Sequence, residues 1–247
     1  KILIISILFG LYGLNNNDID YHYYHILQNK INNLTYGLGG NSSQYRVAYN
    51  SIWLFLQSVF FIENFFYSLY FLNSVIFAVF VRDFYVLIKK TFVNRQIICL
   101  LFCFCTLMFV LASIHKYKDF GTDYAAHLVL LYIVALYFLF FKRNINYNFF
   151  ILTSFLFLFA VICKVFSVVF IIFFLFLIYK IKVSHLLKKL RFKHLVFLSL
   201  PLMIWFSHNI AISGCVVYPI NITCFPDLPW SIQSTGFGSP KHDYQLI

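Results

Sequence analysis

Residues 147–180 read YNFFILTSFLFLFAVICKVFSVVFIIFFLFLIYK, an apolar stretch of 34 residues with one charged side chain, Lys164, in its interior. A membrane-spanning helix needs about 20 apolar residues, so the stretch is too long for one upright crossing and long enough for two short ones. A lysine at the centre of one long helix would cost about 3 kcal/mol or more, whereas a lysine at a turn reaches water. We therefore predict two short helices joined near Cys163–Lys164.

The whole chain shares this apolar character. Of its 247 residues, 62% are hydrophobic and 11% are charged, and its mean hydropathy is +0.81. Soluble domains average about 45–50% apolar and about 25% charged residues. We therefore predict an all-α, polytopic transmembrane helical bundle, a single membrane domain over residues 1–247. Because the chain enters apolar sequence at Lys1 and stops at Ile247 without a further span, we expect a fragment truncated at both ends.

Further helices follow from the other apolar stretches. Three of them each fit one helix: Gln96–Ile114, Tyr124–Phe141 and Leu195–Ile212. The stretch Ser51–Val81 is interrupted by Glu63 and Asn64. We expect one crossing there, over Asn64–Val81, preceded by an interfacial or re-entrant helix from about Tyr45 to Ile62, because the basic residues then separate to one side of the membrane.

The charged residues predict the orientation. Twelve basic residues fall on one side: Arg82, Lys89, Lys90, Arg95, Lys142, Arg143, Lys180, Lys182, Lys188, Lys189, Arg191 and Lys193. Five fall on the other: Lys30, Arg46, Lys116, Lys118 and Lys241. The richer side is cytoplasmic by the positive-inside rule, and this retention explains the net charge of +11 without nucleic acid. We expect a multi-pass protein of a bacterial inner membrane, with the lipid bilayer as its partner.

The opposite, outer face then gathers the carboxylates. It comprises Asn15–Asn50, His115–Asp123 and Ser213 onward, and it holds Asp18, Asp20, Asp119, Asp123, Asp227 and Asp243. Such a group of acids at one membrane rim favours an enzyme or a carrier over a simple anchor.

The first outer loop carries several ionisable residues close together in the sequence. Asp18 and Asp20 could share a divalent cation or divide the roles of base and ligand. His22 and His25, three residues apart, would share one face of a helix. The alternative is a solvated loop with tyrosine and histidine at the headgroup boundary. The spacing of a zinc site is absent. The single cofactor that we consider is a divalent cation held by carboxylates.

Other outer residues add candidate functions. Asp123 lies at the start of a helix, where it can serve as an N-cap, as a site residue or as both. Lys164 either extends to water at a helix break or binds a phosphate or pyrophosphate group. His208 and Asn209 face the outer rim.

Two cysteines share the outer side. Cys215 and Cys224 lie in a segment where a disulfide can persist, although spacing alone does not establish that they pair. Gly214 and Pro219 mark a stiff turn after the last helix.

Several of these motifs together resemble a group of uncharacterised bacterial multi-pass membrane proteins. The residues that carry the resemblance are Gly37-Leu38-Gly39-Gly40, Arg46, Asn50-Ser51-Ile52-Trp53, Thr122-Asp123, Lys164, Ser213-Gly214-Cys215, Tyr218-Pro219 and Thr223-Cys224-Phe225. The similarity extends over most of the chain.

That group in turn resembles the membrane half of the GT-C glycosyltransferases, which use sugar donors linked to a lipid phosphate. By this resemblance, Asp18 or Asp20 would match the catalytic acid that follows the first span. Asp123, Lys164 and the pair His208-Asn209 would support the site. The chain lacks the acidic pair of many first loops in that family and also their soluble C-terminal part.

Three functions follow as hypotheses. The first is a glycosyltransferase or related cell-envelope glycan enzyme that uses a polyprenyl-phosphate-linked sugar. An aspartate of the first loop would deprotonate the acceptor, and Lys164 with Arg46 would stabilise the leaving lipid phosphate. The second is a flippase or transporter, which favours ionisable residues deep in several spans. The third is a non-catalytic membrane scaffold.

Overall fold

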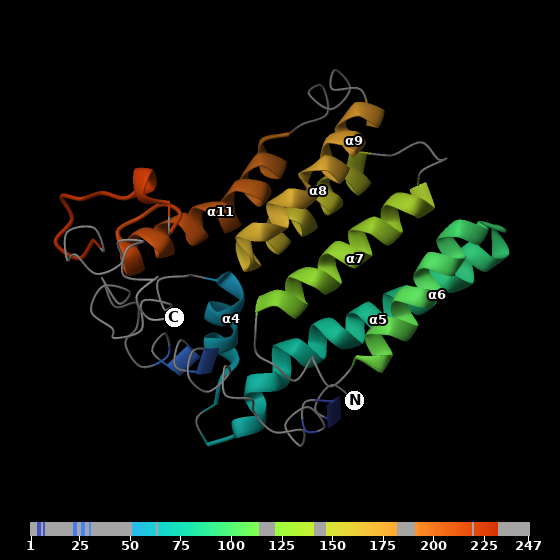
Figure 1. Ribbon diagram of the computed structural model, residues 1–247, viewed down its shortest axis with the longest axis horizontal. Coiled ribbons are helices and arrows are strands. Elements are labelled where there is room, and N and C mark those ends of the chain that lie inside the picture. Colours follow the sequence, from blue (N-terminus) through green and yellow to red (C-terminus); the bar gives the residue numbers. More distant parts are fainter. Residues whose placement is uncertain are drawn as a thin grey trace, which may run out of the picture.

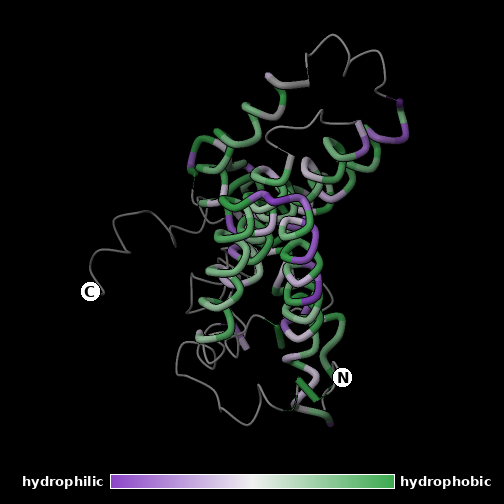
Figure 2. The backbone as a smooth tube through the Cα atoms, turned by 90° about the vertical axis from the view of Figure 1, so that its right-hand side faces the viewer, coloured by the Kyte–Doolittle hydropathy of each residue, from purple (hydrophilic) through white to green (hydrophobic). Residues whose placement is uncertain are grey.

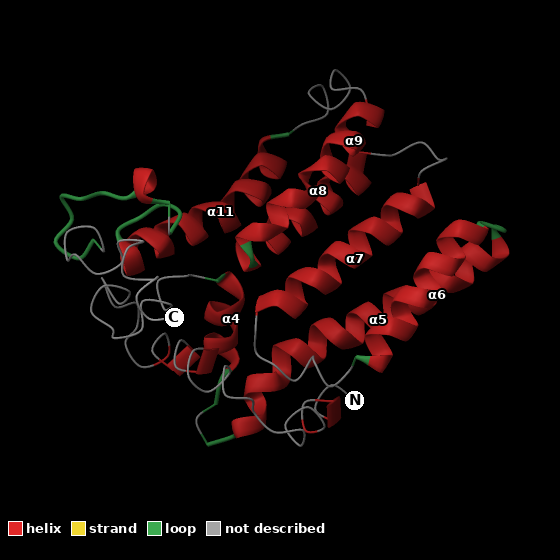
Figure 3. Cartoon of the chain, in the orientation of Figure 1, coloured by secondary structure: helices red, strands yellow, loops and turns green. Residues whose placement is uncertain are grey.

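The computed structural model describes residues 4, 5, 7, 22, 23, 26, 27, 30, 51–62, 64–113, 122–140, 147–181, 191–218 and 220–231. In this part of the chain the secondary structure is helical, and Figure 3 shows helices joined by loops without a strand. The all-α prediction is therefore confirmed.

The main helices lie side by side. They are α5 (Phe71–Val93), α6 (Ile97–Ala112), α7 (Thr122–Phe140), α8 (Tyr147–Cys163), α9 (Ile171–Ile181) and α11 (Phe192–Ser213). In Figure 1 α5, α6, α7, α8 and α11 follow nearly the same direction, and α7 packs against α5, α6 and α8. The short helix α4 (Ile52–Phe60) lies across one end of this bundle.

Among the described residues, two helices are long and apolar enough to cross a membrane, namely Tyr67–Val93 and Phe192–Ser213. Their 27 and 22 residues correspond to about 40 Å and about 33 Å of helix, against a hydrocarbon core of about 30 Å. Figure 2 shows hydrophobic residues along much of the described part of the chain. Length and composition of these two helices thus fit association with a membrane.

The predicted break at Lys164 is confirmed. Helix α8 ends at Cys163, Lys164 has extended backbone angles (φ −146°, ψ 110°), and a 3-10 helix, η5 (Val165–Phe170), leads into α9. The lysine therefore stands at a junction between helices and not inside one.

The helix of the predicted first crossing continues beyond Val81. A 3-10 helix, η3 (Phe66–Tyr70), leads into α5, which continues through Arg82 and Asp83 to Val93. No glycine or proline interrupts this stretch, and the adjacent charges of Arg82 and Asp83 form an ion pair with Nε and Oδ1 3.1 Å apart. The helix ends only where Arg95 adopts a positive φ of 52°.

The expected helix before that crossing is present, but shorter than expected. It covers Ile52–Phe60, and residues 45–50 lie outside the described part of the chain. Ser51 caps its start, because the Ser51 hydroxyl accepts a hydrogen bond from the Trp53 backbone. Ile52, Trp53 and Leu54 are all buried, so α4 is packed onto the end of the bundle through several of its faces.

The buried core has two main parts. Between α5, α6 and α7, the rings of Phe80 and Phe84 stack 4.1 Å apart against Cys103 and Leu136. Between α4, α7, α8 and α11, small residues of α7 and Trp205 of α11 meet the end of α4. The second part includes Cys163, the last residue of α8, and therefore lies next to Lys164.

Candidate functional site

The break at Lys164 is held by α4. The last turn of a helix leaves carbonyl groups without partners, and the Ser51 hydroxyl donates a 2.8 Å hydrogen bond to the carbonyl of Cys163. On the other side, the Ser167 backbone donates to the carbonyl of Lys164 at 2.9 Å. The edge of Trp53 contacts the ring of Phe159 one turn below the break. The position of Lys164 is therefore determined by two helices.

Lys164 forms an ion pair with Asp123. Asp123 lies in the first turn of α7, one residue after the helix begins at Thr122, and so not at the N-cap position before it. A carboxylate there is favoured by the partial positive charge of the helix start. The Lys164 and Asp123 side chains are 33% and 49% exposed, so the pair adds about 0–1 kcal/mol to stability and remains accessible to a ligand.

His127 belongs to the same cluster, and the sequence reasoning missed it. It lies one turn after Asp123 on α7 and interacts electrostatically with both Asp123 and Lys164. Its ring also meets the edge of Tyr124. The signal that could have found it is the spacing of four residues from Asp123, which places both side chains on one helix face. The cluster thus combines a carboxylate, an ammonium and an imidazole.

His208 lies near the C-terminal end of α11 and is 6% exposed. Its ring contacts the ring of Phe55 on α4, with centroids 5.0 Å apart. Within the described part of the chain, neither ring nitrogen has a hydrogen-bond partner. A buried polar group without a partner is costly and needs an explanation, and a bound ligand or water is one.

Asn209 has a structural contact. Its side-chain amide donates a 2.9 Å hydrogen bond to the carbonyl of Val216, and the hydroxyl of Ser213 donates to the carbonyl of Asn209 at 2.8 Å. The first bond ties the end of α11 to the segment that follows, and the second lies within the last turn of the helix. The structure therefore gives Asn209 a role in holding that segment.

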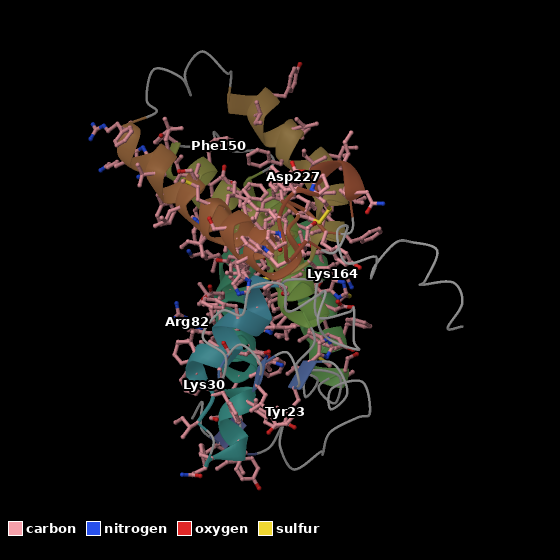
Figure 4. All side chains as sticks on the ribbon, turned by 90° about the vertical axis from the view of Figure 1, so that its left-hand side faces the viewer. Tyr23, Lys30, Arg82, Phe150, Lys164 and Asp227 are labelled. Carbon is pink, nitrogen blue, oxygen red and sulfur yellow. A yellow bond between two sulfur atoms is a disulfide. The ribbon has the colours of Figure 1, made fainter. Side chains whose placement is uncertain are left out.

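The segment after α11, residues 214–218 and 220–231, folds back on the helix end. Gly214 has a φ of +73° and closes α11. Cys215 and Cys224 form a disulfide, and the Trp230 indole donates to the carbonyl of Ile210 at 3.1 Å. This segment, which we call the C-terminal cap, also carries Asp227, which Figure 4 labels.

The first outer loop is not joined to this cluster in the described residues. Asp18, Asp20, His25 and Arg46 lie outside the described part of the chain. His22 is described, and the ring of its neighbour Tyr23 contacts Phe61, with centroids 6.1 Å apart. Figure 4 shows Tyr23 well separated from Lys164.

Metal binding has no support from the described side chains. Among them, no group of three or more histidine, cysteine, aspartate or glutamate residues could hold a metal ion. The chemistry that this part of the chain offers is ionic and acid–base: Lys164 can bind an anion, while Asp123 and His127 can accept or donate protons.

Comparison with known proteins gives a family. The model of the family described as "Domain of unknown function (DUF8201)" matches residues 2–239, and the chain belongs to this family. No curated protein and no solved structure matches it.

Proposed function

We propose that this member of the DUF8201 family is a multi-pass protein of a bacterial inner membrane that transfers a sugar from a lipid phosphate to an acceptor on the outer face. The observation that carries the proposal is the exposed Asp123–Lys164 pair at a helix break beneath α4. Likeness to the GT-C glycosyltransferases is part of this proposal.

The apolar surface supports a multi-pass arrangement. Large apolar side chains are exposed along α6, α9 and α11, among them Ile98 (74%), Phe109 (63%), Ile172 (68%) and Met203 (62%). Soluble monomers rarely expose contiguous apolar patches larger than a few hundred Å². Lipid chains are the solvent that such surfaces fit, and they would cover the shorter helices as well as the two long ones.

The position of Lys164 supports phosphate binding. An ammonium at the rim of a bilayer can meet the phosphate of a lipid without leaving its own helix junction. Because Asp123 holds the ammonium in place by an exposed ion pair, a phosphate oxygen can replace or share that partner. His127 provides a second polar group beside it.

The proposed reaction is a displacement at the anomeric carbon. The acceptor hydroxyl oxygen forms a bond to that carbon, the bond from that carbon to the phosphate oxygen breaks, and the lipid phosphate leaves with the electron pair. Asp18 or Asp20 takes the proton of the acceptor hydroxyl. Lys164, together with Arg46, stabilises the negative charge that develops on the leaving phosphate.

The test uses the purified protein in lipid nanodiscs. Binding of polyprenyl phosphate is measured for the wild-type protein, for Lys164→Met and for Lys89→Met. Lys89→Met is the matched control, because Lys89 lies near the C-terminal end of α5 and outside the Asp123–Lys164 cluster. We expect Lys164→Met to lose at least tenfold in affinity, because a charge-assisted contact is removed, and Lys89→Met to bind normally. If Lys164→Met bound polyprenyl phosphate as tightly as Lys89→Met, the proposed phosphate site would be refuted.

Catalysis is tested separately. With a radiolabelled polyprenyl-phosphate-linked sugar, we expect Asp18→Asn combined with Asp20→Asn to abolish the glycan product while phosphate binding persists. Loss of binding in that double variant would show that the first loop binds the donor, and full activity would exclude both aspartates as the base.

A flippase is the second candidate, and one observation favours it. Arg82 and Asp83 lie in the interior of α5 and not at its end. Ionisable residues inside a span mark transport pathways in many membrane proteins. Movement of a fluorescent lipid-linked sugar across liposomes, with no glycan formed, would favour this function over sugar transfer.

A further inference from the structure

A cavity that is open along one side lies between α5, α7 and α8, away from the Asp123–Lys164 cluster. Two of its lining side chains, Val79 and Leu152, are 46% and 48% exposed. Its volume is about 440 Å³, within the range of about 300–1,000 Å³ that is typical of small-molecule sites. Side chains of α5, α7 and α8 line it: Ile76, Val79, Phe80, Asp83, Leu128, Val129, Tyr132, Leu152, Phe155, Leu156 and Phe159. Nine of these are purely hydrocarbon, and the polar atoms belong to Asp83 and Tyr132.

The two polar groups lie together at one end of the cavity. Tyr132 and Asp83 interact electrostatically. Along α5, Asp83 is seven residues from Ile76, which corresponds to about 10 Å of helix. The cavity is therefore elongated, with a polar inner end at Asp83 and an apolar outer end near Ile76 and Phe159.

The charge of Asp83 is balanced from outside the cavity. Arg82 is 76% exposed on its side chain, it does not line the cavity, and Figure 4 shows it extending outward from the bundle. Its Nε lies 3.1 Å from an Asp83 oxygen. A carboxylate has about four lone-pair positions, and Arg82 uses one of them. Acceptor capacity therefore remains at the inner end of the cavity.

We infer that this cavity binds an amphiphile with an apolar body about 10 Å long and a neutral hydroxyl head, an aliphatic alcohol, whose O–H donates a hydrogen bond to Asp83. An alkyl ammonium would add an unbalanced charge to the neutral Arg82–Asp83 pair, which is costly inside a membrane. A fatty acid would place a second carboxylate beside Asp83. A plain hydrocarbon tail would leave the polar end without a new partner.

The test uses the full chain in detergent micelles and a decanol carrying a photoactivatable diazirine. We expect adducts on α5, α7 and α8 by mass spectrometry, and we expect unlabelled decanol to suppress them at concentrations at least tenfold lower than decane or decanoic acid. Suppression by decane as strong as by decanol would refute the polar head, and adducts spread evenly over all helices would refute the cavity.

Variants separate this site from the outer one. Leu156→Trp and Val79→Trp fill the cavity from opposite walls, so each folded variant should lose the adducts. Asp83→Asn, which keeps the size of the side chain, should weaken protection by decanol about tenfold, the size expected when a bond to a charged acceptor is lost. Lys164→Met should label normally, so this test stands or fails independently of phosphate binding. Normal labelling of both tryptophan variants would overturn the inference.

Discussion

Replacing the buried imidazole of His208 should stabilise the protein. Neither ring nitrogen of His208 has a partner in the described part of the chain, and leaving a buried polar group unpaired costs about 1–3 kcal/mol. His208→Leu removes that penalty but also the ring contact with Phe55 at 5.0 Å, which is worth about 0.5–1.5 kcal/mol. We expect a net gain of about 1 kcal/mol, or a rise of about 2–4 °C in Tm for a chain of this size.

The assay is thermal unfolding in detergent, with Ser213→Ala as the matched control. The Ser213 hydroxyl, equally buried at the same helix end, donates to the carbonyl of Asn209 at 2.8 Å and accepts from the backbone of Cys215 at 3.2 Å. Its loss leaves a buried donor unpaired and should lower Tm. A fall in Tm for His208→Leu as large as that for Ser213→Ala would refute the reasoning, because it would show an imidazole with satisfied nitrogens.

The same variant informs function. Residues kept at a cost in stability are frequent at binding sites. If His208 contacts a ligand, we expect His208→Leu to gain stability and lose binding of polyprenyl phosphate, while His208→Gln, which keeps a donor and an acceptor, retains part of it. A stabilised variant with normal binding would place His208 outside the site.

Three further changes test other parts of the chain. Cys215→Ser opens a disulfide between residues nine positions apart and should cost about 2–3 kcal/mol; Tm should fall, and a reductant should lower Tm of the wild-type protein alone. Gly214→Ala should lower Tm by several degrees, because φ is +73° and the added Cβ would lie 2.6 Å from Cα of Ser231. An unchanged Tm would mean that the C-terminal cap moves away from Gly214 without cost. In intact cells and a cysteine-free background, an impermeant thiol reagent should label Asn41→Cys but not Lys189→Cys, and the reverse pattern would invert the topology.

The helix break at Lys164 could be predicted because its cause is local. A single ammonium in the middle of an apolar stretch of 34 residues has few positions of low energy in a membrane, and a junction between helices is one of them. The disulfide could be proposed but not decided, because spacing carries no information on how the chain turns between Cys215 and Cys224.

The interior position of Arg82 and Asp83 could not be predicted from charge alone. A charged residue after an apolar stretch usually indicates the end of a span, and the positive-inside rule counts each charge separately, without pairing it to a neighbour. The structure pairs them on one helix, so the end of α5 depends on the backbone at Arg95 and not on the first charge. Sequence reasoning missed His127 for a related reason, because one of its two charged neighbours, Lys164, lies far along the chain at the end of α8.

The short turn between α5 and α6 has a consequence for biogenesis. Only Asn94, Arg95 and Gln96 separate the two helices. On scales of insertion through the translocon, an arginine or aspartate near the centre of a helix costs about 2.5–3.5 kcal/mol, which disfavours entry of α5 alone. Helix α6 contains no charged residue over Ile97–Ala112 and follows at once. We expect the ribosome to deliver the two helices as one hairpin, with α6 supplying the hydrophobicity that draws α5 and its ion pair into the bilayer.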